Sequence, residues 1–587
     1  MSNGSDLHPR SLIAEYFWKY RGRFAWGFLL LACTNLLALS VPRMLKHAVD
    51  ALQASDRRAL LAFSLAIIGL AFAQALVRTW SRLAVLGASR HVASDLRDRL
   101  FSHLQRLPLT YYGRHATGDI ISRSVNDMLL VRSFFGPGMM NLINTLLVYV
   151  TTVSMMFSMD LRLTLYALAP YPFFLIAVNR LSRRIYSHSI ALQEQLGTIT
   201  SRAQENISGI SLIKTYARED EEAAAWAGLS RDYLQRALAL ARVRGALVPL
   251  MGIMASAGTL VVVGLGGRAV IEGRISLGDF VAFNAYLAFL VWPTFAFGWI
   301  LNTFQRGTSA LRRIGEILAE PAEERELPSE DSAPPLAGGI VMRQLSFAHQ
   351  GAPAGVLHLD HVDLAVKPGG SLGILGTVGS GKTTLVSLVP RMLPAPPGTV
   401  LLDGRDINDI PLARLRRDIG MVTQEPFLFS RSIRENIALA PRPFTSSDID
   451  EVVAASRLSN DLPDFPRGLD TIVGERGFTL SGGQRQRATI ARALITKPPI
   501  LIFDDALSSL DAQVEQEVVE SLKQHRGRST ILMVSNRVAS LSWADHIIVM
   551  DGGRIVEQGS HEALMTAGGF YARIARRQSL VADLEGA

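Results

Sequence analysis

The most informative stretch of this 587-residue chain is SLGILGTVGSGKTTL, residues 371–385. Apolar residues 372–375 predict a buried strand, and residues 376–383 then match the phosphate-binding pattern G-x-x-x-x-G-K-[ST]. Glycines let the backbone of such a loop wrap around phosphate oxygens, and the helix that follows adds N–H donors at its first turn. Alternating strand and helix patterns surround this stretch, so it predicts an α/β nucleotide-binding domain.

The loop supplies most of the residues expected to bind the nucleotide. Lys382 would pair with the β- and γ-phosphates, and the hydroxyl of Thr383 would bind Mg²⁺. The expected nucleotide contacts within this loop are Gly376, Thr377, Gly379, Ser380, Gly381, Lys382, Thr383 and Thr384.

A second stretch completes the nucleotide site and reads ILIFDDALSSLDA, residues 500–512. Its first four residues predict a buried parallel strand. Asp504, at the end of that strand, would hold Mg²⁺ through water, and Asp505 occupies the position from which a base addresses the attacking water. A third stretch, TLSGGQRQR at residues 479–487, lies between these two motifs.

The first half of the chain has a different composition. Hydrophobic residues make up 48% of the sequence and gather in long runs before about residue 310. A membrane-spanning helix needs about 20 mostly apolar residues. The candidate spans are residues 24–42, 59–80, 134–159, 161–178, 246–270 and 278–302.

The expected fold is therefore a membrane α-helical bundle with six transmembrane helices, fused to an α/β P-loop domain. We expect the membrane domain at residues 1–320 and the nucleotide-binding domain at residues 340–578. The segment 321–339 is rich in proline and acidic residues and predicts a linker, and residues 579–587 predict a C-terminal tail.

The charge distribution indicates how the chain is oriented. Lys and Arg outnumber Asp and Glu by 60 to 52, a net charge of +8, and the arginines gather at residues 83–132 and 179–244. Loops on the cytoplasmic side carry such an excess. We therefore expect an inner-membrane protein with both termini and the nucleotide-binding domain in the cytoplasm, with lipid and not nucleic acid around its basic segments.

The N-terminal segment also suits a membrane surface. We expect no cleavable signal peptide here, and the apolar side of the segment would lie on the inner face of the bilayer as an amphipathic helix. The residues of that side are Leu12, Ile13, Tyr16, Phe17 and Tyr20. The single cysteine, Cys33, excludes a disulfide within one chain.

The order of motifs resembles that of ATP-binding cassette (ABC) domains. The P-loop is followed by Gln424 in VTQEPFLFS, then LSGGQ at residues 480–484, the strand that ends in aspartate, and SSLDA. With its membrane half, the whole chain resembles a half-transporter of the ABC exporters of the type IV fold, most of all the MdlA-type, multidrug-resistance-like bacterial subunits. Residues 111–127 and 205–220 look like the two cytoplasmic coupling regions of that family.

This resemblance implies a dimer in which two cassettes hold ATP between them, head to tail. Gln424 would contact Mg²⁺, as Thr383 and Asp504 would, and it would also sense the membrane domain. Asp511 would cross the dimer interface, and residues 473–477 would touch the coupling regions. A tyrosine usually stacks on adenine in this family, and His349 occupies its position here. The residues implied to contact ATP held by the partner are Ser481, Gly482, Gly483 and Gln484.

Two further departures affect hydrolysis. The family's usual base is a glutamate and its usual switch residue is a histidine, but this chain has Asp505 and Asn536. The aspartate carboxylate is withdrawn by roughly 1.5 Å, about one methylene. Asn536 can donate a hydrogen bond to a γ-phosphate but cannot be protonated. We therefore expect a site that binds Mg-ATP and hydrolyses it slowly or not at all.

An intact LSGGQ beside a weakened base favours one subunit of a heterodimeric exporter whose partner carries the glutamate and the histidine. Two alternatives stay open: a homodimeric exporter with slow hydrolysis, and an ATP-gated channel or regulatory receptor. Import is not expected, because the membrane and nucleotide-binding domains share one chain. By resemblance, the substrate would be a small amphipathic drug, a lipid or a peptide.

Overall fold

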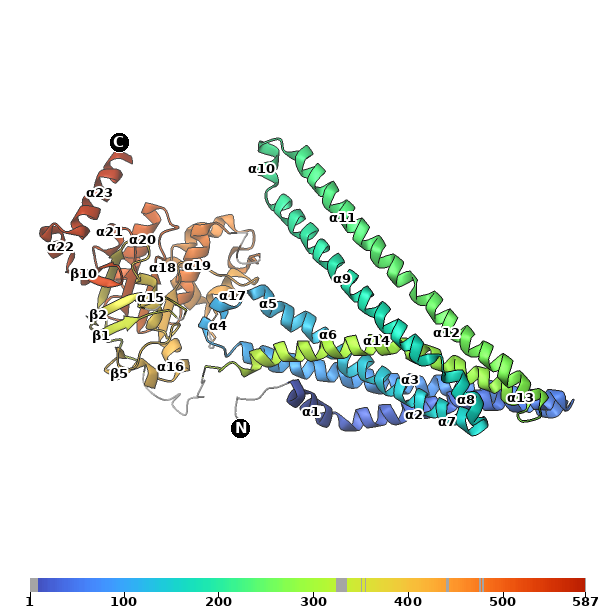
Figure 1. Ribbon diagram of the computed structural model, residues 1–587. Helices are drawn as coiled ribbons and strands as arrows, with labels where there is room; N and C mark the ends of the chain where they lie inside the picture. The colour runs from blue at the N-terminus through green and yellow to red at the C-terminus, as the bar shows by residue number, and fades with distance from the viewer. Residues whose placement is uncertain are drawn as a thin grey trace. The chain divides into compact units, whose positions relative to one another are not determined.

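The architecture comes from a computed structural model that describes residues 9–323, 335–349, 351–353, 355–439, 443–474, 477 and 480–585. The chain divides into two compact units (Figure 1). Met1–Gln105 and His115–Pro321 form the membrane unit, and Arg106–Arg114 and Ala322–Ala587 form the nucleotide-binding unit. Most of the expected linker, residues 324–334, lies outside the described residues.

The described part of the membrane unit contains six helices that are long and apolar enough to cross a bilayer. Each contains one of the expected spans, so the predicted number and order are confirmed. Their bounds are Arg21–Gln53, Arg57–Leu104, Thr117–Met159, Leu161–Ser208, Glu219–Ile271 and Leu277–Ala319.

The membrane unit is built from the following elements, several of which join end to end to form one long helix. Up to residue 159 they are α1 (Pro9–Lys19), α2 (Arg21–Gln53), α3 (Arg57–Leu104), α5 (Thr117–Ser122), the π-helix η1 (Arg123–Asp127), α6 (Met128–Ser133), η2 (Phe134–Gly138) and α7 (Met139–Met159). From residue 161 they are α8 (Leu161–Leu168), α9 (Tyr171–Ser208), α10 (Ile210–Thr215), α11 (Glu219–Gly245), α12 (Leu247–Val261), η3 (Val262–Gly266), α13 (Gly267–Ile271) and α14 (Leu277–Ala319).

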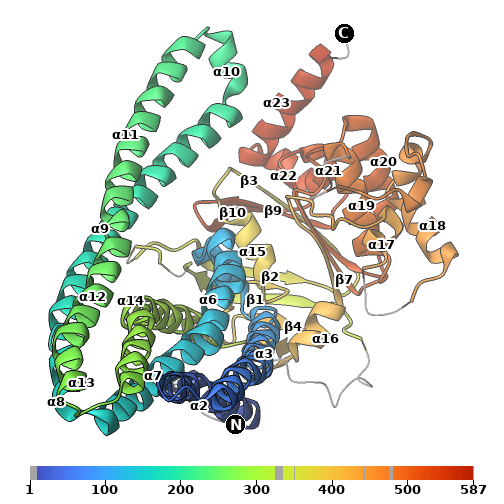
Figure 2. The ribbon, with the colours of Figure 1, turned by 90° about the vertical axis from the view of Figure 1, so that its right-hand side faces the viewer.

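The arginine-rich segments that join the expected spans are mostly helical, because the membrane helices continue beyond the spans. α3 continues to Leu104, α9 continues to Ser208, and α11 begins at Glu219. These extensions lack proline and are rich in Ala, Leu, Arg, Gln and Glu, which favour helix even where the residues are polar. α9 and α11 lie side by side as a long hairpin closed by α10 (Figure 2).

The N-terminal helix α1 packs against the other helices of the membrane unit, whereas its apolar side was expected to face lipid. Leu12 and Tyr16, on its apolar side, are buried within the unit. Lys19 Nζ lies 2.5 Å from Asp95 Oδ2 of α3, and Arg99 Nη1 of α3 lies 3.0 Å from Glu15 Oε1. The helix forms as expected, but part of the face assigned to lipid packs on protein.

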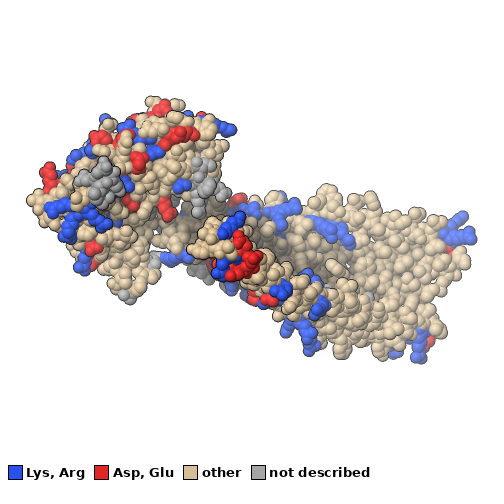
Figure 3. Space-filling model, turned by 90° about the horizontal axis from the view of Figure 1, so that it is seen from above, with Lys and Arg blue, Asp and Glu red and all other residues tan. Residues whose placement is uncertain are grey.

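The outer surface of the unit identifies its surroundings. One face of α3 carries large apolar side chains at helical spacing, all more than half exposed: Leu61, Leu65, Ile68, Phe72, Leu76 and Trp80. A broad band without charged side chains covers this unit on the face shown in Figure 3. Soluble proteins rarely expose apolar patches of this extent, so a bilayer is the environment that this surface fits.

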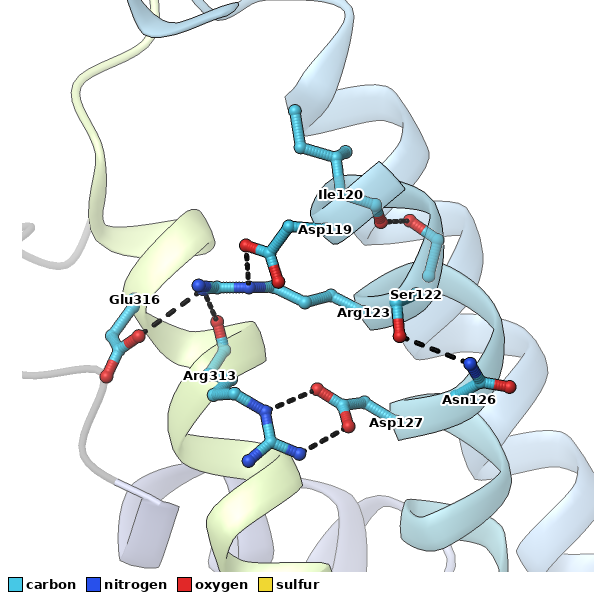
Figure 4. Close-up of polar contacts among 9 residues, drawn as sticks. Asp119, Ile120, Ser122, Arg123, Asn126, Asp127, Arg313 and Glu316 are labelled. Atoms are coloured by element: carbon cyan, nitrogen blue, oxygen red, sulfur yellow. Dashed lines mark hydrogen bonds and ion pairs between the residues drawn. The ribbon is translucent and has the colours of Figure 1, made fainter. Parts of the chain in front are cut away.

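An ion-pair network joins α14 to the helical segment after α5 (Figure 4). Arg313 Nε and Nη2 donate to Asp127 Oδ2 and Oδ1 over 2.8 and 2.5 Å, and Asp127 is buried. Arg123 Nη1 donates to the carbonyl oxygen of Arg313 over 3.1 Å and pairs with Glu316 and Asp119. Arg123 and Asp127 bound the π-helix η1, a local widening that often marks a functional segment.

The nucleotide-binding unit contains a six-stranded sheet in the order β10-β9-β3-β8-β7-β6 and an antiparallel sheet in the order β2-β1-β4-β5. In the first sheet, β9, β3, β8, β7 and β6 are parallel, and β10 pairs antiparallel at the edge. The strands are β1 (Ile340–Phe347), β2 (Leu359–Val366), β3 (Ser371–Gly376), β4 (Val400–Leu402), β5 (Arg405–Asp406), β6 (Ile419–Val422), β7 (Ile500–Asp504), β8 (Thr530–Val534), β9 (His546–Asp551) and β10 (Arg554–Gly559).

Both faces of the parallel sheet are buried, which explains the continuous apolar runs of its strands. Leu501 and Phe503 of β7 point to a core that includes residues of α19 and α20. Ile500 and Ile502 point to the opposite core, which includes α15 and the antiparallel sheet. Alternation of side chains along one strand therefore fills both cores.

Some helices of this unit pack on the two sheets, among them α15, α19 and α20. The helices of the unit are α4 (Leu109–Arg114), α15 (Lys382–Leu388), η4 (Ile407–Asp409), α16 (Leu412–Arg417), α17 (Ile433–Ile437), α18 (Ser446–Ala455), η5 (Leu458–Asp464), η6 (Gly468–Asp470), α19 (Gly482–Leu494), α20 (Ala512–Lys523), α21 (Val538–Leu541), α22 (His561–Ala567) and α23 (Phe570–Glu585). α23 runs through most of the segment expected as a tail.

Candidate functional site

Neighbouring parallel strands bring the sequence motifs to one edge of the sheet. Ile374 of β3 and Asp504 of β7 both pair with Val534 of β8, and Val422 of β6 pairs with Phe503. The carboxyl ends of these strands therefore meet where ligands bind in open α/β sheets. The loops that leave this edge carry the P-loop, Asp504, Asp505, Asn536 and Gln424.

The P-loop has the backbone that its glycines predict. Gly379 and Gly381 have φ values of 82° and 94°, which L side chains rarely adopt. A Cβ at Gly381 would lie 2.6 Å from the carbonyl oxygen of His358, and one at Gly376 would collide with the carbonyl oxygen of Met550. Successive N–H groups around such left-handed positions form a concavity that suits anions.

Two side chains of this loop fit a polyphosphate. Lys382 Nζ donates to the carbonyl oxygens of Gly376 and Thr377 over 2.8 and 2.7 Å, so the ammonium is held over the loop. Burial lowers the pKa of Lys382, because it disfavours the charged form. The buried hydroxyl of Ser380 has no hydrogen-bond partner within the described residues. Phosphate oxygens would satisfy both groups.

The first aspartate lies beside the P-loop threonine. Thr383 Oγ1 donates to Asp504 Oδ1 over 3.1 Å, and Asp504 is only 2% exposed. Burial raises the pKa of Asp504, and the nearby charge of Asp505 adds to this effect. Hydroxyl and carboxylate oxygens are ligands that Mg²⁺ prefers, so the pair fits a magnesium ion bound together with phosphates.

The second aspartate has a fixed backbone. Asp505 has a left-handed φ of 48°, and its N–H donates to the carbonyl oxygen of Val534 over 3.0 Å. Its own carbonyl oxygen accepts from Ser508 Oγ over 2.8 Å. The carboxylate is half-buried, and burial raises the pKa of Asp505 while Lys382 opposes the rise.

The loop after β8 places Asn536 at the same edge, with its side chain exposed. The adjacent Arg537 pairs with Glu515 of α20, and its N–H donates to Ser535 Oγ over 3.0 Å. Glu515 is 5% exposed and also accepts from Ser540. Sequence reasoning missed Glu515, because an acidic residue on a helix predicts solvent exposure when nothing reveals its partners. Gln424 is exposed in the loop after β6.

His349 lies next to the helix that follows the P-loop. Its Nε2 forms a hydrogen bond of 3.2 Å with Thr384 Oγ1. Its ring meets that of His358 edge to face, with 4.5 Å between centroids. Burial lowers the pKa of His349, and His358 adds to this. Sequence reasoning missed His358, whose spacing from His349 carries no recognisable signal.

A cavity of about 280 Å³ adjoins this histidine on the nucleotide-binding unit. Thr110 of α4 lines it together with His349 and the end of β1. The lining residues are Thr110, Ser346, Phe347, Ala348, His349, Leu393, Pro394, Ala395 and Pro396.

The LSGGQ segment forms the start of α19, with Leu480 buried and Ser481 exposed. Ser481 caps α19: its hydroxyl accepts from the N–H of Gln484 over 3.2 Å, and its N–H donates to Gln484 Oε1 over 3.0 Å. A Cβ at Gly483 would lie 3.4 Å from the carbonyl oxygen of Ser509, so this segment packs on the SSLDA loop. Asp511 in that loop caps α20.

Some residues of the expected site cannot be placed. Residues 475–476, which belong to the segment expected to touch the coupling regions, lie outside the described residues, as does Thr479 before the LSGGQ segment. Val473, at the start of that segment, is buried.

Comparison with known families and proteins identifies the family of this chain. Residues 24–294 match the family model of the ABC transporter transmembrane region, and residues 359–508 match that of the ABC transporter. The chain is 32% identical to YheI of Bacillus subtilis, described as a probable multidrug resistance ABC transporter ATP-binding/permease protein, over 97% of this chain and 98% of that protein.

Two further relatives extend the match. The multidrug resistance-like ATP-binding protein MdlA of Escherichia coli is 32% identical, over 98% of both chains. A solved bacterial Atm1-family ABC exporter with ATP bound is similar in structure, with a TM-score of 0.76 and 25% identity over 95% of this chain and 98% of that one. The chain therefore belongs to the ABC transporter family, as an exporter half-transporter in which a multi-pass membrane domain is fused to one ATP-binding cassette.

Proposed function

We propose that this chain is one subunit of a heterodimeric ATP-driven exporter of the cytoplasmic membrane, with its cassette in the cytoplasm and a slow or inactive ATP site of its own. The observation that carries the proposal is the short side chain of Asp505 on a fixed backbone. Hydrogen bonds to Val534 and from Ser508 hold that backbone on both sides. The backbone therefore cannot shift toward the nucleotide to compensate for the side chain of aspartate, which is one methylene shorter than that of glutamate.

The displacement is large enough to matter for catalysis. A misplacement of about 1 Å in a reacting group can cost about 10²-fold in rate. Asn536 adds to the loss, because a carboxamide can donate to a γ-phosphate but cannot take part in proton transfer. Both changes act on the step in which water attacks, and they leave the groups that bind ATP in place.

The binding groups support retention of Mg-ATP. Lys382 is held over the P-loop, Ser380 has an unused hydroxyl, and Thr383 contacts Asp504. Bound Mg²⁺ would neutralise charge on the β- and γ-phosphates. In the proposal, Thr383, Asp504 and Gln424 hold the ion, His349 stacks on adenine, and Asn536 donates to the γ-phosphate. The site stays loaded because binding is intact and the base is weak.

The LSGGQ segment supports a role in the partner's site. Ser481 is exposed at the start of α19, and Gly483 lies close to the SSLDA loop, so the hydroxyl of Ser481 is accessible to a ligand outside this chain. In a head-to-tail dimer, Ser481 and Gly483 would contact ATP held by the partner, which carries the glutamate and the histidine. Hydrolysis there would drive the membrane domains between inward-facing and outward-facing states. The substrate of the proposal is an amphipathic drug, a lipid or a peptide; two relatives are named for multidrug resistance and a third is named as a lipid A-core flippase.

The test is the ATPase activity of this chain reconstituted with the half-transporter encoded beside it. Replacing the catalytic glutamate of the partner by alanine should abolish activity, while Asp505→Ala should change it less than about threefold. Lys382→Ala serves as the control that empties this chain's own site. The proposal that this chain carries the weak site would be overturned if Asp505→Ala abolished activity while replacement of the partner's glutamate did not.

A homodimeric exporter with two slow sites is the second candidate. Its support is that Asp505 remains a carboxylate near Lys382 and that Ser481 is present in the same chain. Brisk ATP hydrolysis by purified homodimers of this chain would favour it.

A further inference from the structure

The C-terminal helix reaches the loop that carries Asn536. Gln578 of α23 donates from Nε2 to the carbonyl oxygen of Asn536 over 2.8 Å, and its Oε1 accepts from the N–H of Val538 over 2.8 Å. One carboxamide thus closes two hydrogen bonds, one on each side of Arg537. Neither bond depends on the identity of the side chain at residue 536.

The position of Gln578 is itself well defined. The first turn of α23 is anchored on β10, because Glu557 accepts from the N–H groups of Phe570 and Tyr571, the latter over 3.0 Å. Tyr571 is fully buried and its hydroxyl contacts His561 Nδ1 over 2.8 Å. Gln578 lies about two helical turns beyond Tyr571, on the same side of the helix.

Other contacts fix the residues around Asn536 from the sheet side. The N–H of Ser535 donates to the carbonyl oxygen of Ile374 over 3.2 Å, and Arg537 pairs with the buried Glu515. These contacts hold the residues before and after Asn536. The hydrogen bond from Gln578 holds the peptide group of Asn536 itself, from which its exposed side chain extends.

We propose that Gln578 is a positioning residue that keeps the carboxamide of Asn536 directed at the γ-phosphate, so that α23 controls the preference of this chain for ATP over ADP. The proposal rests on the role of Asn536 in the proposed function. Gln578 does not touch the nucleotide and acts through the backbone of residues 536 and 538. ADP has no γ-phosphate, so this contact contributes to the binding of ATP alone.

The test measures ATP and ADP affinity separately. Full-length chain in detergent carries Asp505→Asn in every sample to block hydrolysis, and Mg-ATP or Mg-ADP displaces a fluorescent ADP analogue. Gln578→Met keeps the length of the side chain and removes both hydrogen bonds. It should lower the affinity for ATP about fivefold, which is the equivalent of one hydrogen bond, and change the affinity for ADP by less than about twofold. Gln578→Glu keeps an acceptor for the N–H of Val538 but sets a carboxylate oxygen against the carbonyl oxygen of Asn536, so it should weaken ATP binding at least as much as Gln578→Met.

Controls separate positioning from general damage. Arg577→Met alters the adjacent exposed residue of the same helix and should leave both affinities unchanged. Hydrogen exchange at the Val538 amide should accelerate in Gln578→Met and not in Arg577→Met. An unchanged ratio of ATP to ADP affinity in Gln578→Met, or equal weakening of both nucleotides, overturns the proposal.

This outcome is separate from that of the heterodimer proposal. If the chain with Asp505 intact hydrolyses ATP briskly on its own, the weak site is refuted, yet the affinity ratio still reports on Gln578. Conversely, a lone chain without hydrolysis and with an unchanged ratio keeps the weak site and rejects the role of Gln578.

Discussion

The N–H of Asp505 donates a 3.0 Å hydrogen bond to the carbonyl oxygen of Val534, the last residue of the neighbouring strand. Asp505 also adopts a left-handed φ of 48°, and its carbonyl oxygen accepts from Ser508 Oγ. With the backbone fixed in this way, the length of the side chain alone determines how far the carboxylate reaches. The rate of hydrolysis should therefore respond to a single methylene.

Replacing Asp505 and Asn536 by the usual glutamate and histidine should give the lone chain hydrolytic activity. We expect Asp505→Glu with Asn536→His to raise the ATPase rate of purified homodimers by about 10²-fold, because the first change restores the reach of the carboxylate and the second restores a side chain that can be protonated. Each single change should raise the rate less than the pair does. Phosphate release in detergent measures the effect.

Lys382→Ala in the doubly restored chain serves as the control and should return the rate to background. No increase in the doubly restored chain, with ATP binding intact, would show that the carboxylate reach does not limit this site.

Neutralising Asp505 should stabilise the protein without nucleotide. Burial raises the pKa of Asp505, so the folded state disfavours the ionised carboxylate relative to the unfolded state. That penalty applies above the unfolded pKa of about 3.9 and disappears as the pH falls through the folded value toward it. We expect Asp505→Asn to give a small rise in Tm at pH 7 that shrinks on acidification.

Asp464→Asn, at an exposed position of the same cassette, is the matched control and should leave Tm unchanged both at pH 7 and after acidification. A fall in Tm for Asp505→Asn at pH 7 would mean that Lys382 and Arg537 compensate the carboxylate fully.

A tyrosine at position 349 should tighten ATP binding. His349 lies 3.2 Å from Thr384 through Nε2, beside the helix that follows the P-loop. A larger ring in that place offers more stacking area, worth about 0.5–1.5 kcal/mol. We expect His349→Tyr to lower the Kd for ATP by about threefold, His349→Ala to raise it, and His361→Tyr, at an exposed histidine, to do neither. Equal affinities for ATP in all of these variants would show that His349 does not contact the adenine.

The ion pair between Asp127 and Arg313 should stabilise the membrane unit. Its two hydrogen bonds join η1 to α14, and Asp127 is 5% exposed. Removing one partner of such a pair costs about 1–3 kcal/mol when the other is partly solvated. Asp127→Asn and Arg313→Met should each lower Tm in detergent, and the double variant should lose little more than either alone.

The exposed pair Arg312–Glu316 offers the matched control, because its atoms are 3.9 Å apart and both side chains are more than half exposed. Arg312→Met should leave Tm almost unchanged. Additive losses for Asp127→Asn and Arg313→Met would show that the two side chains act independently.

Much of this architecture follows from local sequence. The P-loop strand, its glycines and the strand that ends in Asp504 each carry their own signal, and length with hydropathy locates the six spans. Parallel pairing through Val534 then brings distant motifs to one edge, a relationship that follows from the order of strands in the sheet.

Other features needed the folded chain. Leu12 and Tyr16 are apolar whether they face lipid or protein, so amphipathicity alone could not assign them. The arginine-rich segments are polar, so hydropathy alone could not show how far the membrane helices continue through them. Gln578 and Asn536 are 42 residues apart, and a glutamine on a helix carries no sign of its partner. Contacts of this kind depend on how α23 docks, which no local pattern encodes.

The most direct test of the central claim is the ATPase rate of this chain purified alone in detergent, beside the same chain co-expressed with the half-transporter encoded next to it. The account predicts a rate near background for the lone chain and substantial hydrolysis for the pair. Brisk hydrolysis by the lone chain as a dimer would show that Asp505 is a working base and would contradict the weak site.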